Sequence, residues 1–373
     1  MKGQWLGAYT GFIEGELSVQ GKMMVNIDEM DSFFRGVISA TPENIKEIPA
    51  SIISFKTKDK SDKHDVNAYI EAVNPYGLTA CSWNEIKHLY AKDIIHSNTA
   101  DANVCLIDGA LHITAKTDQN LTITAKLSKA ETQKESRIVG VKKSWIEFKN
   151  YLSELDKNTF LFRGQQKPWK LQTSFHRRGR YCIDEFLRRD IKVLHQKLSA
   201  LTSHYFDLNI PEQNGAFFNL LQHHGYPTPL LDWSYSPYVS AFFAFRDWPS
   251  NYEGKEYVRI YIFNNKLWQD NTLQSLNLNP CVPHLSVQEF IAINNSRLVP
   301  QQALTTVTNI DDIEDYLLQG GEVTQLKFIE AIDIPANERE VAMQDLRYMG
   351  ITAGSMFPGL DGACEELREQ NFS

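Results

Sequence analysis

Residues 219–245, NLLQHHGYPTPLLDWSYSPYVSAFFAF, form the stretch on which the fold of this chain depends. Its middle is a short apolar run that carries one charged residue, Asp232, and this pattern predicts a buried strand over 228–233. Pro237 follows Ser236, a residue type that caps helices, so we expect an apolar core helix to begin there. A strand that leads directly into a helix N-terminus leaves backbone N–H groups available to a phosphate or an amide ligand.

A second stretch, FLFRGQ at 160–165, predicts an apolar strand that ends in an arginine. Arg163 needs a partner there, because burying an isolated charge is costly. A structural role predicts an ion pair with a carboxylate such as that of Asp232. A functional role predicts contact with a phosphate or with the ribose of a nicotinamide nucleotide, which suit the planar guanidinium group. Both roles can hold at once.

The composition bounds the class of protein. At 373 residues with 42% hydrophobic residues, the chain is long enough for two domains, each with its own core. The formal charge of −8 argues against a generally basic nucleic-acid-binding protein. Residues 163–192 nevertheless carry nine basic and three acidic side chains, a local charge of +6. Within this segment, a solvated helix face accounts for residues 188–192, whereas Arg177, Arg178 and Arg180 are interpreted as an anion-binding turn.

The cysteines and the hydropathy pattern bear on the cellular location of the protein and on whether it binds a metal ion. Five cysteines lie far apart without a C-x-x-C pair, which favours a reducing, cytoplasmic location and predicts no metal site. The N-terminus lacks the apolar run of a signal peptide, and no segment has the length of uninterrupted apolar sequence that a membrane span needs. We therefore expect a cytoplasmic protein that does not enter a membrane.

The order of patterns predicts two domains. Residues 1–128 hold short runs of alternating polar and apolar residues at the spacing of an all-β barrel or sandwich. Apolar residues nearly vanish from KAETQKESR at 129–137, so we place a linker at 129–139. Residues 140–373 mix strand and helix patterns and predict an α+β domain.

Over residues 140–370 the chain resembles the FRG domain family, which is named for a Phe-Arg-Gly strand motif. The motifs that carry the resemblance are FRGQ at 162–165 with Trp169, QHHGYPT at 222–228, LLDWS at 230–234, AFFA at 241–244, NSRL at 295–298 with Gln301, and FPGLDG at 357–362.

The resemblance implies a fold and a set of catalytic residues. The order of the motifs is similar to that of ADP-ribosyltransferases and implies a split mixed β-sheet in the second domain. By position, Arg163 would bind a phosphate or ribose of NAD, and Ser234 would lie in the nicotinamide pocket. Gln301 or Gln302 would take the third place of the site. The carboxylate of Asp232 or of Glu289 would stabilise the ribosyl cation.

The resemblance also implies which residues contact the cofactor. Those placed beside NAD are Arg163, Gly164, Gln165, His223, Ser234, Tyr235 and Ser236. A glutamine cannot act as a general base, so the group that activates the acceptor is left open among Asp232, His223, His224 and Glu289. The two histidines also end a predicted helix, where imidazole interacts favourably with the helix dipole.

Three hypotheses follow. The first is an NAD-dependent ADP-ribosyltransferase-like effector, a toxin or antiviral defence protein that modifies RNA or protein and is controlled by an antitoxin or regulatory protein. The second is a non-catalytic module that binds a nucleotide or nucleic acid in the same cleft. The third is that Arg163 and Asp232 form an ion pair that only specifies the fold.

Overall fold

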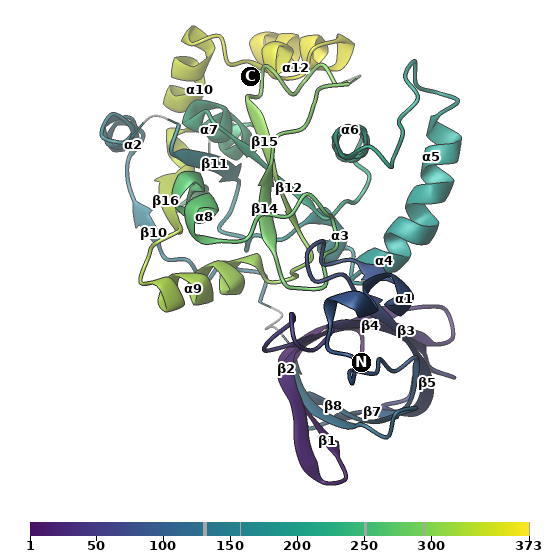
Figure 1. Cartoon of the computed structure of the whole chain (residues 1–373). Coiled ribbons are helices and arrows are strands. Elements are labelled where there is room, and N and C mark those ends of the chain that lie inside the picture. The colour runs from purple at the N-terminus through teal and green to yellow at the C-terminus, as the bar shows by residue number, and fades with distance from the viewer. Residues whose placement is uncertain (130–132, 157, 250–251, 294, 373) are drawn as a thin grey trace.

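The structure is a computed structural model that describes residues 1–129, 133–156, 158–249, 252–293 and 295–372. In this part of the chain, eight antiparallel strands near the N-terminus close into a barrel, which Figure 1 shows at the bottom of the molecule. They are β1 (Gly3–Ile13), β2 (Glu16–Glu29), β3 (Phe34–Pro42), β4 (Ser51–Lys56), β5 (Lys63–Val73), β7 (Thr99–Ile107), β8 (Ala110–Thr117) and β9 (Thr122–Lys129).

The barrel closes because β4 pairs with β5 at the ends of the strand order β4-β3-β2-β1-β9-β8-β7-β5. The connection from β5 to β7 holds the short strand β6 (Ala80–Cys81), the helix α1 (Trp83–Ile86) and a 3₁₀ turn at Lys87–Leu89. Alternate residues of the strands fill the interior, as His64, Val66 and Ala68 do in β5. The expected all-β region is therefore confirmed as a closed barrel.

The second region contains a mixed sheet of seven strands within the described residues, in the order β10-β16-β13-β11-β12-β15-β14. They are β10 (Gly140–Lys142), β11 (Phe160–Gln165), β12 (Leu230–Ser234), β13 (Tyr257–Asn264), β14 (Leu285–Gln288), β15 (Ala303–Thr308) and β16 (Ile329–Pro335). β10 and β16 run parallel, whereas the other neighbours are antiparallel.

Helices surround this sheet. They are α2 (Trp145–Leu152), α3 (Ser174–Arg177), α4 (Ile183–Glu185), a π-helical segment (Phe186–Ile191), α5 (Lys192–Leu198), α6 (Pro211–His223), α7 (Pro237–Phe245), α8 (Asn265–Asn271), α9 (Ile313–Thr324), a 3₁₀ turn (Ala336–Glu338), α10 (Arg339–Tyr348), α11 (Ala353–Met356) and α12 (Leu360–Phe372). Alternate strand residues enter two cores, so that Phe162 packs with α7 while Leu161 packs with Trp233 and Phe263. None of the helices that the structure describes is long and apolar enough to cross a membrane.

The sheet is split between β11 and β12. Across the described residues, β11 forms six residue pairs with β13 but only the pair Phe162–Ser234 with β12. The two strands therefore meet at one point and diverge beyond it, which confirms the expected α+β region with a split mixed sheet. A space opens where they diverge.

The barrel packs directly on the second region. The buried carboxylate of Asp28 accepts hydrogen bonds from the backbone N–H of Tyr181 (2.6 Å) and from Nε of Arg180 (2.8 Å). Cys182 and Cys281 of the second region share an apolar cluster with barrel residues such as Val37. Residues 130–132 of the predicted linker lie outside the described residues, and the proposed domain boundaries stay a prediction.

Candidate functional site

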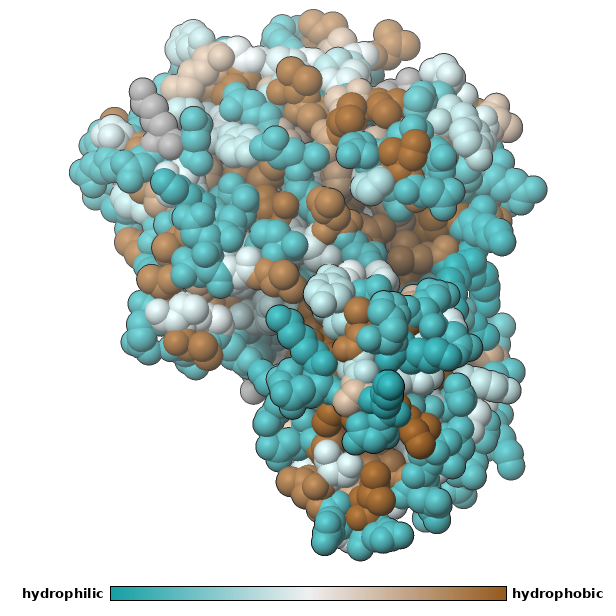
Figure 2. Space-filling view, in the orientation of Figure 1, coloured by the Kyte–Doolittle hydropathy of each residue, from teal (hydrophilic) through white to brown (hydrophobic). Residues whose placement is uncertain are grey.

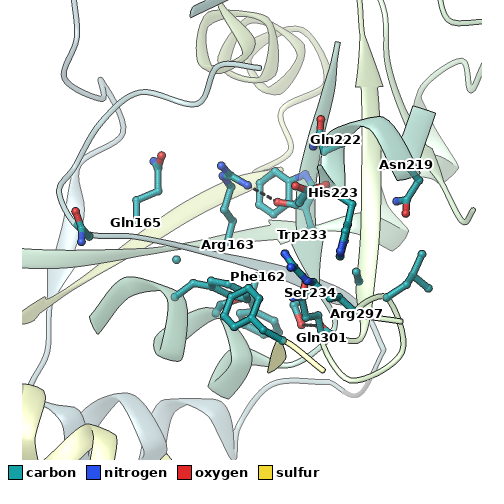
Figure 3. Close-up of a pocket in the computed structure, with 18 of the residues that line it drawn as sticks. Phe162, Arg163, Gln165, Asn219, Gln222, His223, Trp233, Ser234, Arg297 and Gln301 are labelled. Carbon is teal, nitrogen blue, oxygen red and sulfur yellow. Dashed lines mark hydrogen bonds between the residues drawn. The ribbon is translucent and has the colours of Figure 1, made fainter. Parts of the chain in front are cut away.

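A cavity of about 680 Å³ opens at the split, between β11, β12 and α6 (Figure 3). The motifs of the sequence converge on it from segments far apart in the chain. The residues that line it are Phe162, Arg163, Gly164, Gln165, Gln166, Trp169, Lys170, Arg177, Asn219, Gln222, His223, Asp232, Trp233, Ser234, Ser240, Phe243, Asp247, Asn295, Arg297, Leu298, Gln301, Ala303 and Phe357.

Arg163 lies at the centre of the cavity in Figure 3. Its Nη1 donates a hydrogen bond to the main-chain carbonyl of Asp232 (2.6 Å), which joins the two diverging strands. Its Nε is buried and has no hydrogen-bond partner among the residues that the structure describes. Burial lowers the pKa of the guanidinium, and the nearby carboxylate of Asp232 opposes this effect. Arg163 thus binds the backbone of Asp232, and the direct side-chain ion pair that a purely structural role predicts is replaced by this contact.

The carboxyl group of Asp232 is accessible from the cavity but surrounded by protein. The loss of bulk water raises its pKa, and this effect exceeds the opposing influence of Arg163, of a hydrogen bond from Gln222 and of Arg177. A carboxyl group whose pKa is raised in a cleft is suited to accept or hold a proton during a reaction.

Helix α6 delivers three polar side chains, those of Asn219, Gln222 and His223, to the opposite wall of the cavity (Figure 3). The amide of Gln222 accepts a hydrogen bond from the hydroxyl of Thr228, and Asn219 accepts one from the amide of Asn295. Burial and the charge of Arg297 lower the pKa of His223 to about 4, so its imidazole is neutral at pH 7.

The cavity carries a positive formal charge. Among the described lining residues, the cations Arg163, Lys170, Arg177 and Arg297 face the carboxylates of Asp232 and Asp247, a balance of four against two and so a charge of +2. The Nζ of Lys170 also lies 3.6 Å from a carboxylate oxygen of Asp312, a residue that does not line the cavity. The lining therefore favours an anionic ligand.

The three arginines of the predicted anion-binding turn have different surroundings. Arg177 lines the cavity, where its Nη1 donates to the carbonyl of Gln172 and burial lowers its pKa. Arg180 instead bonds to Asp28 and to Asp190 at the barrel interface. Arg178 is exposed and outside the lining. Of this cluster, Arg177 is the residue that the fold brings to the site.

Ser234 and Gln301 lie in the cavity wall, but their polar groups are engaged with the main chain. The hydroxyl of Ser234 donates to the carbonyl of Gln301 (2.7 Å) and accepts from the N–H of Ser236 (3.0 Å). The side-chain amide of Gln301 donates to the carbonyl of Met356 (2.9 Å). These bonds tie the end of β12 to the turn that holds Arg297.

Other predicted site residues lie outside the lining. Ser236 caps α7 by accepting from the N–H of Val239 (3.2 Å). The hydroxyl of Tyr235 donates to Glu289 (2.6 Å). A contact of these residues with a cofactor stays a prediction.

Two further candidates also lie elsewhere. His224 lines a separate apolar groove of about 660 Å³ together with leucines of α5 and α6, a region where Figure 2 shows hydrophobic side chains gathered. Gln302 lies outside the lining and accepts the N–H of Tyr235 through its carbonyl (3.0 Å). Of the two glutamines considered for the third place, Gln301 is therefore the one in the wall.

Several lining residues were not expected as site residues. Gln222, Asn295, Arg297 and Phe357 belong to the motifs quoted above, so the motif positions themselves were the available signal. Asn219 lies one helical turn before His223 and carries no signal of its own. Across the described ranges, no group of three or more His, Cys, Asp or Glu residues could hold a metal ion.

Comparison with models of known protein families gives one match. Residues 158–253, which include β11, α6, β12 and α7, match the family model described as the FRG domain. No curated protein matches the chain.

Proposed function

We propose that this protein, which carries an FRG domain, binds NAD at the split of its sheet and transfers ADP-ribose to an acceptor. One observation carries the proposal: the diverging strands β11 and β12 bring Arg163 and Asp232 to one cavity, a cation from one strand and a carboxyl of raised pKa from the other. Pairs of titratable groups in contrasting environments are typical of catalytic sites.

The charge and hydrogen-bonding capacity of the cavity fit the diphosphate of NAD. Arg163 lines the cavity, so the accessible part of its guanidinium can donate to a phosphate oxygen. Arg177 and Arg297 also line the cavity and add positive charge to it. A volume of about 680 Å³ lies within the range of cavities that hold small-molecule ligands and cofactors.

Transfer of ADP-ribose has two steps, and Asp232 would act in each. The bond between C1′ of the ribose and the nicotinamide nitrogen breaks, and nicotinamide leaves with the electron pair. The ionised carboxylate of Asp232 would stabilise the cation that develops at C1′. A nucleophile of the acceptor then forms the new bond to C1′, and Asp232 would accept the proton that the nucleophile loses.

The acceptor we propose is RNA or a protein. Asp232 and Arg177 are exposed to solvent from the cavity, which allows a macromolecule to reach the reacting carbon. On this account the protein is an effector, a toxin or an antiviral defence protein, and an antitoxin or other regulatory protein would restrain it.

Incubation of the purified protein with labelled NAD and cell extract tests the proposal. We expect release of nicotinamide and transfer of label, both strongly reduced in Asp232→Asn and in Arg163→Lys. Thermal unfolding of each variant serves as the control for folding. If the wild type neither turns over NAD nor transfers label, and so does not differ from folded Arg163→Lys, the proposal is wrong.

The second candidate function is binding of a nucleotide or nucleic acid without chemistry. It is favoured by the third place of the site, where the amide of Gln301 is bonded to Met356 and the hydroxyl of Ser234 to the carbonyl of Gln301. Calorimetry separates the two candidates, because this one predicts that NAD binds with no release of nicotinamide. Steep salt dependence with RNA would extend it to nucleic acid.

A further inference from the structure

Trp169 combines a fixed main chain with an exposed side chain at the cavity. Its carbonyl accepts hydrogen bonds from the amide of Gln165 (2.8 Å) and from the hydroxyl of Tyr261 (2.5 Å). Its N–H donates to the carbonyl of Lys167 (2.7 Å), and it forms a bridge with Glu135. The residue is nevertheless 43% exposed.

The neighbouring residues hold the same segment in place. The N–H of Lys170 donates to the carbonyl of Lys134 (3.0 Å), and the N–H of Leu171 donates to Glu314 (2.9 Å). Within the described residues, no aromatic ring or cation is recorded against the indole of Trp169. A large apolar surface that is held in place and exposed at a cavity is suited to stack on a flat ligand ring.

The cavity extends to both sides of Arg163. Figure 3 shows Gln165, which holds Trp169, on one side of Arg163 and Arg297 on the other. The guanidinium of Arg297 lies over the ring of Phe357, 5.0 Å from its centroid. A tryptophan thus belongs to one end of the cavity and a phenylalanine to the other, with Arg163 between them.

We infer that Trp169 forms a subsite for the adenine ring of a nucleotide whose diphosphate lies on Arg163. This inference rests on the proposed use of NAD, since the reacting ribose must lie at Asp232 and the ring at the opposite end of the diphosphate is then the adenine.

Calorimetric titration with ADP-ribose and with nicotinamide mononucleotide tests the subsite. Trp169→Ala is expected to weaken ADP-ribose binding about tenfold, the usual loss when a base loses an aromatic platform. Binding of nicotinamide mononucleotide, which lacks adenine, is expected to change less than twofold. Trp169→Phe retains a ring and is expected to bind ADP-ribose almost as the wild type does. Tyr348→Ala removes an exposed aromatic side chain of α10 outside the cavity and is the matched control.

The outcomes distinguish failure of the subsite from failure of the proposed function. Equal losses for both ligands, no loss for either, or no binding of ADP-ribose to the wild type would overturn the adenine subsite. A selective loss of ADP-ribose binding without any NAD turnover by the wild type would support the subsite and reject the transferase. If NAD turnover depends on Asp232 but Trp169→Ala leaves ADP-ribose binding unchanged, the transferase is supported and the adenine subsite is rejected.

Discussion

Gly164 shows at the level of one residue why the Phe-Arg-Gly motif ends in glycine. A Cβ atom built there would lie 1.8 Å from the carbonyl oxygen of Ser240 and 3.0 Å from the N of Ala244, both in the backbone of α7. Contact of β11 with α7 therefore requires a residue without a side chain. The motif glycine allows the helix to pack close beneath the strand that presents Arg163.

We predict that Gly164→Ala destabilises the protein by about 2 kcal/mol or more, because the backbone of α7 must move to admit the methyl group. Urea unfolding measures the loss. Gly77→Ala is the control, since Gly77 is exposed and the nearest atom to its added Cβ is 3.5 Å away. Equal stability of Gly164→Ala and the wild type would contradict the close packing of α7.

Asp232 leads to a prediction on stability and pH. Because its folded-state pKa is raised, the ionised carboxylate costs free energy in the folded protein above that pKa, whereas below the unfolded value both states are protonated. Asp232→Asn should therefore raise the free energy of unfolding near pH 7.5, and the gain should shrink as the pH falls toward the unfolded value of about 4. Unfolding curves across this range test the sign, with Asp247→Asn, the other carboxyl group of the cavity lining, as the control. A loss of stability at pH 7.5 would mean that attraction to nearby cations outweighs the partial loss of water around the carboxylate of Asp232.

At the level of the element, the end of β12 joins the start of α7 to the turn before β15. Ser234 makes this junction through its two hydrogen bonds to main-chain groups of Gln301 and Ser236. The structure thus gives Ser234 a positioning role beside the nicotinamide role that the resemblance implies.

Ser234→Ala distinguishes the two roles of this serine. Loss of the hydroxyl leaves the partly buried carbonyl of Gln301 and the buried N–H of Ser236 without their partner, so we expect destabilisation of about 2 kcal/mol. Chemical denaturation measures it, and Ser236→Ala, which removes the cap of α7, offers a comparison at about 1 kcal/mol. A variant as stable as the wild type but with reduced NAD turnover would instead favour direct contact with nicotinamide.

The elements were largely predictable because their signals are local. Alternation predicted the strands of the barrel, and Ser236 followed by Pro237 predicted the start of α7, which the structure confirms. The cavity was predictable only where a motif marked it, as at Arg163 and Asp232. Asn219 and Arg177 reach it through the packing of α6 and α3, which depends on contacts between segments distant in the chain.

At the level of the whole molecule, the barrel supports the segment that carries Arg177. Asp28 of β2 binds Arg180, Tyr181 and the N–H of Cys182 (3.3 Å), only a few residues after Arg177. Sequence patterns could not predict this contact, because about 150 residues separate the partners. The barrel therefore serves as one support of the site.

Asp28→Ala tests this support. Its removal leaves the buried N–H groups of Tyr181 and Cys182 without their acceptor, whereas Arg180 keeps Asp190, and we expect a loss of about 3 kcal/mol. Thermal or urea unfolding measures the loss, and Asp31→Ala, an exposed carboxylate at the next turn of the barrel, is the control. If both variants unfold like the wild type, the barrel does not stabilise the second region through Asp28.

The central claim is that the split between β11 and β12 is a site for NAD, and a crystal structure with NAD bound tests it most directly. The account predicts the diphosphate within hydrogen-bonding distance of the guanidinium of Arg163 and the nicotinamide ribose facing Asp232. Crystals grown at saturating NAD that show the nucleotide elsewhere, or this cavity without it, would contradict the account.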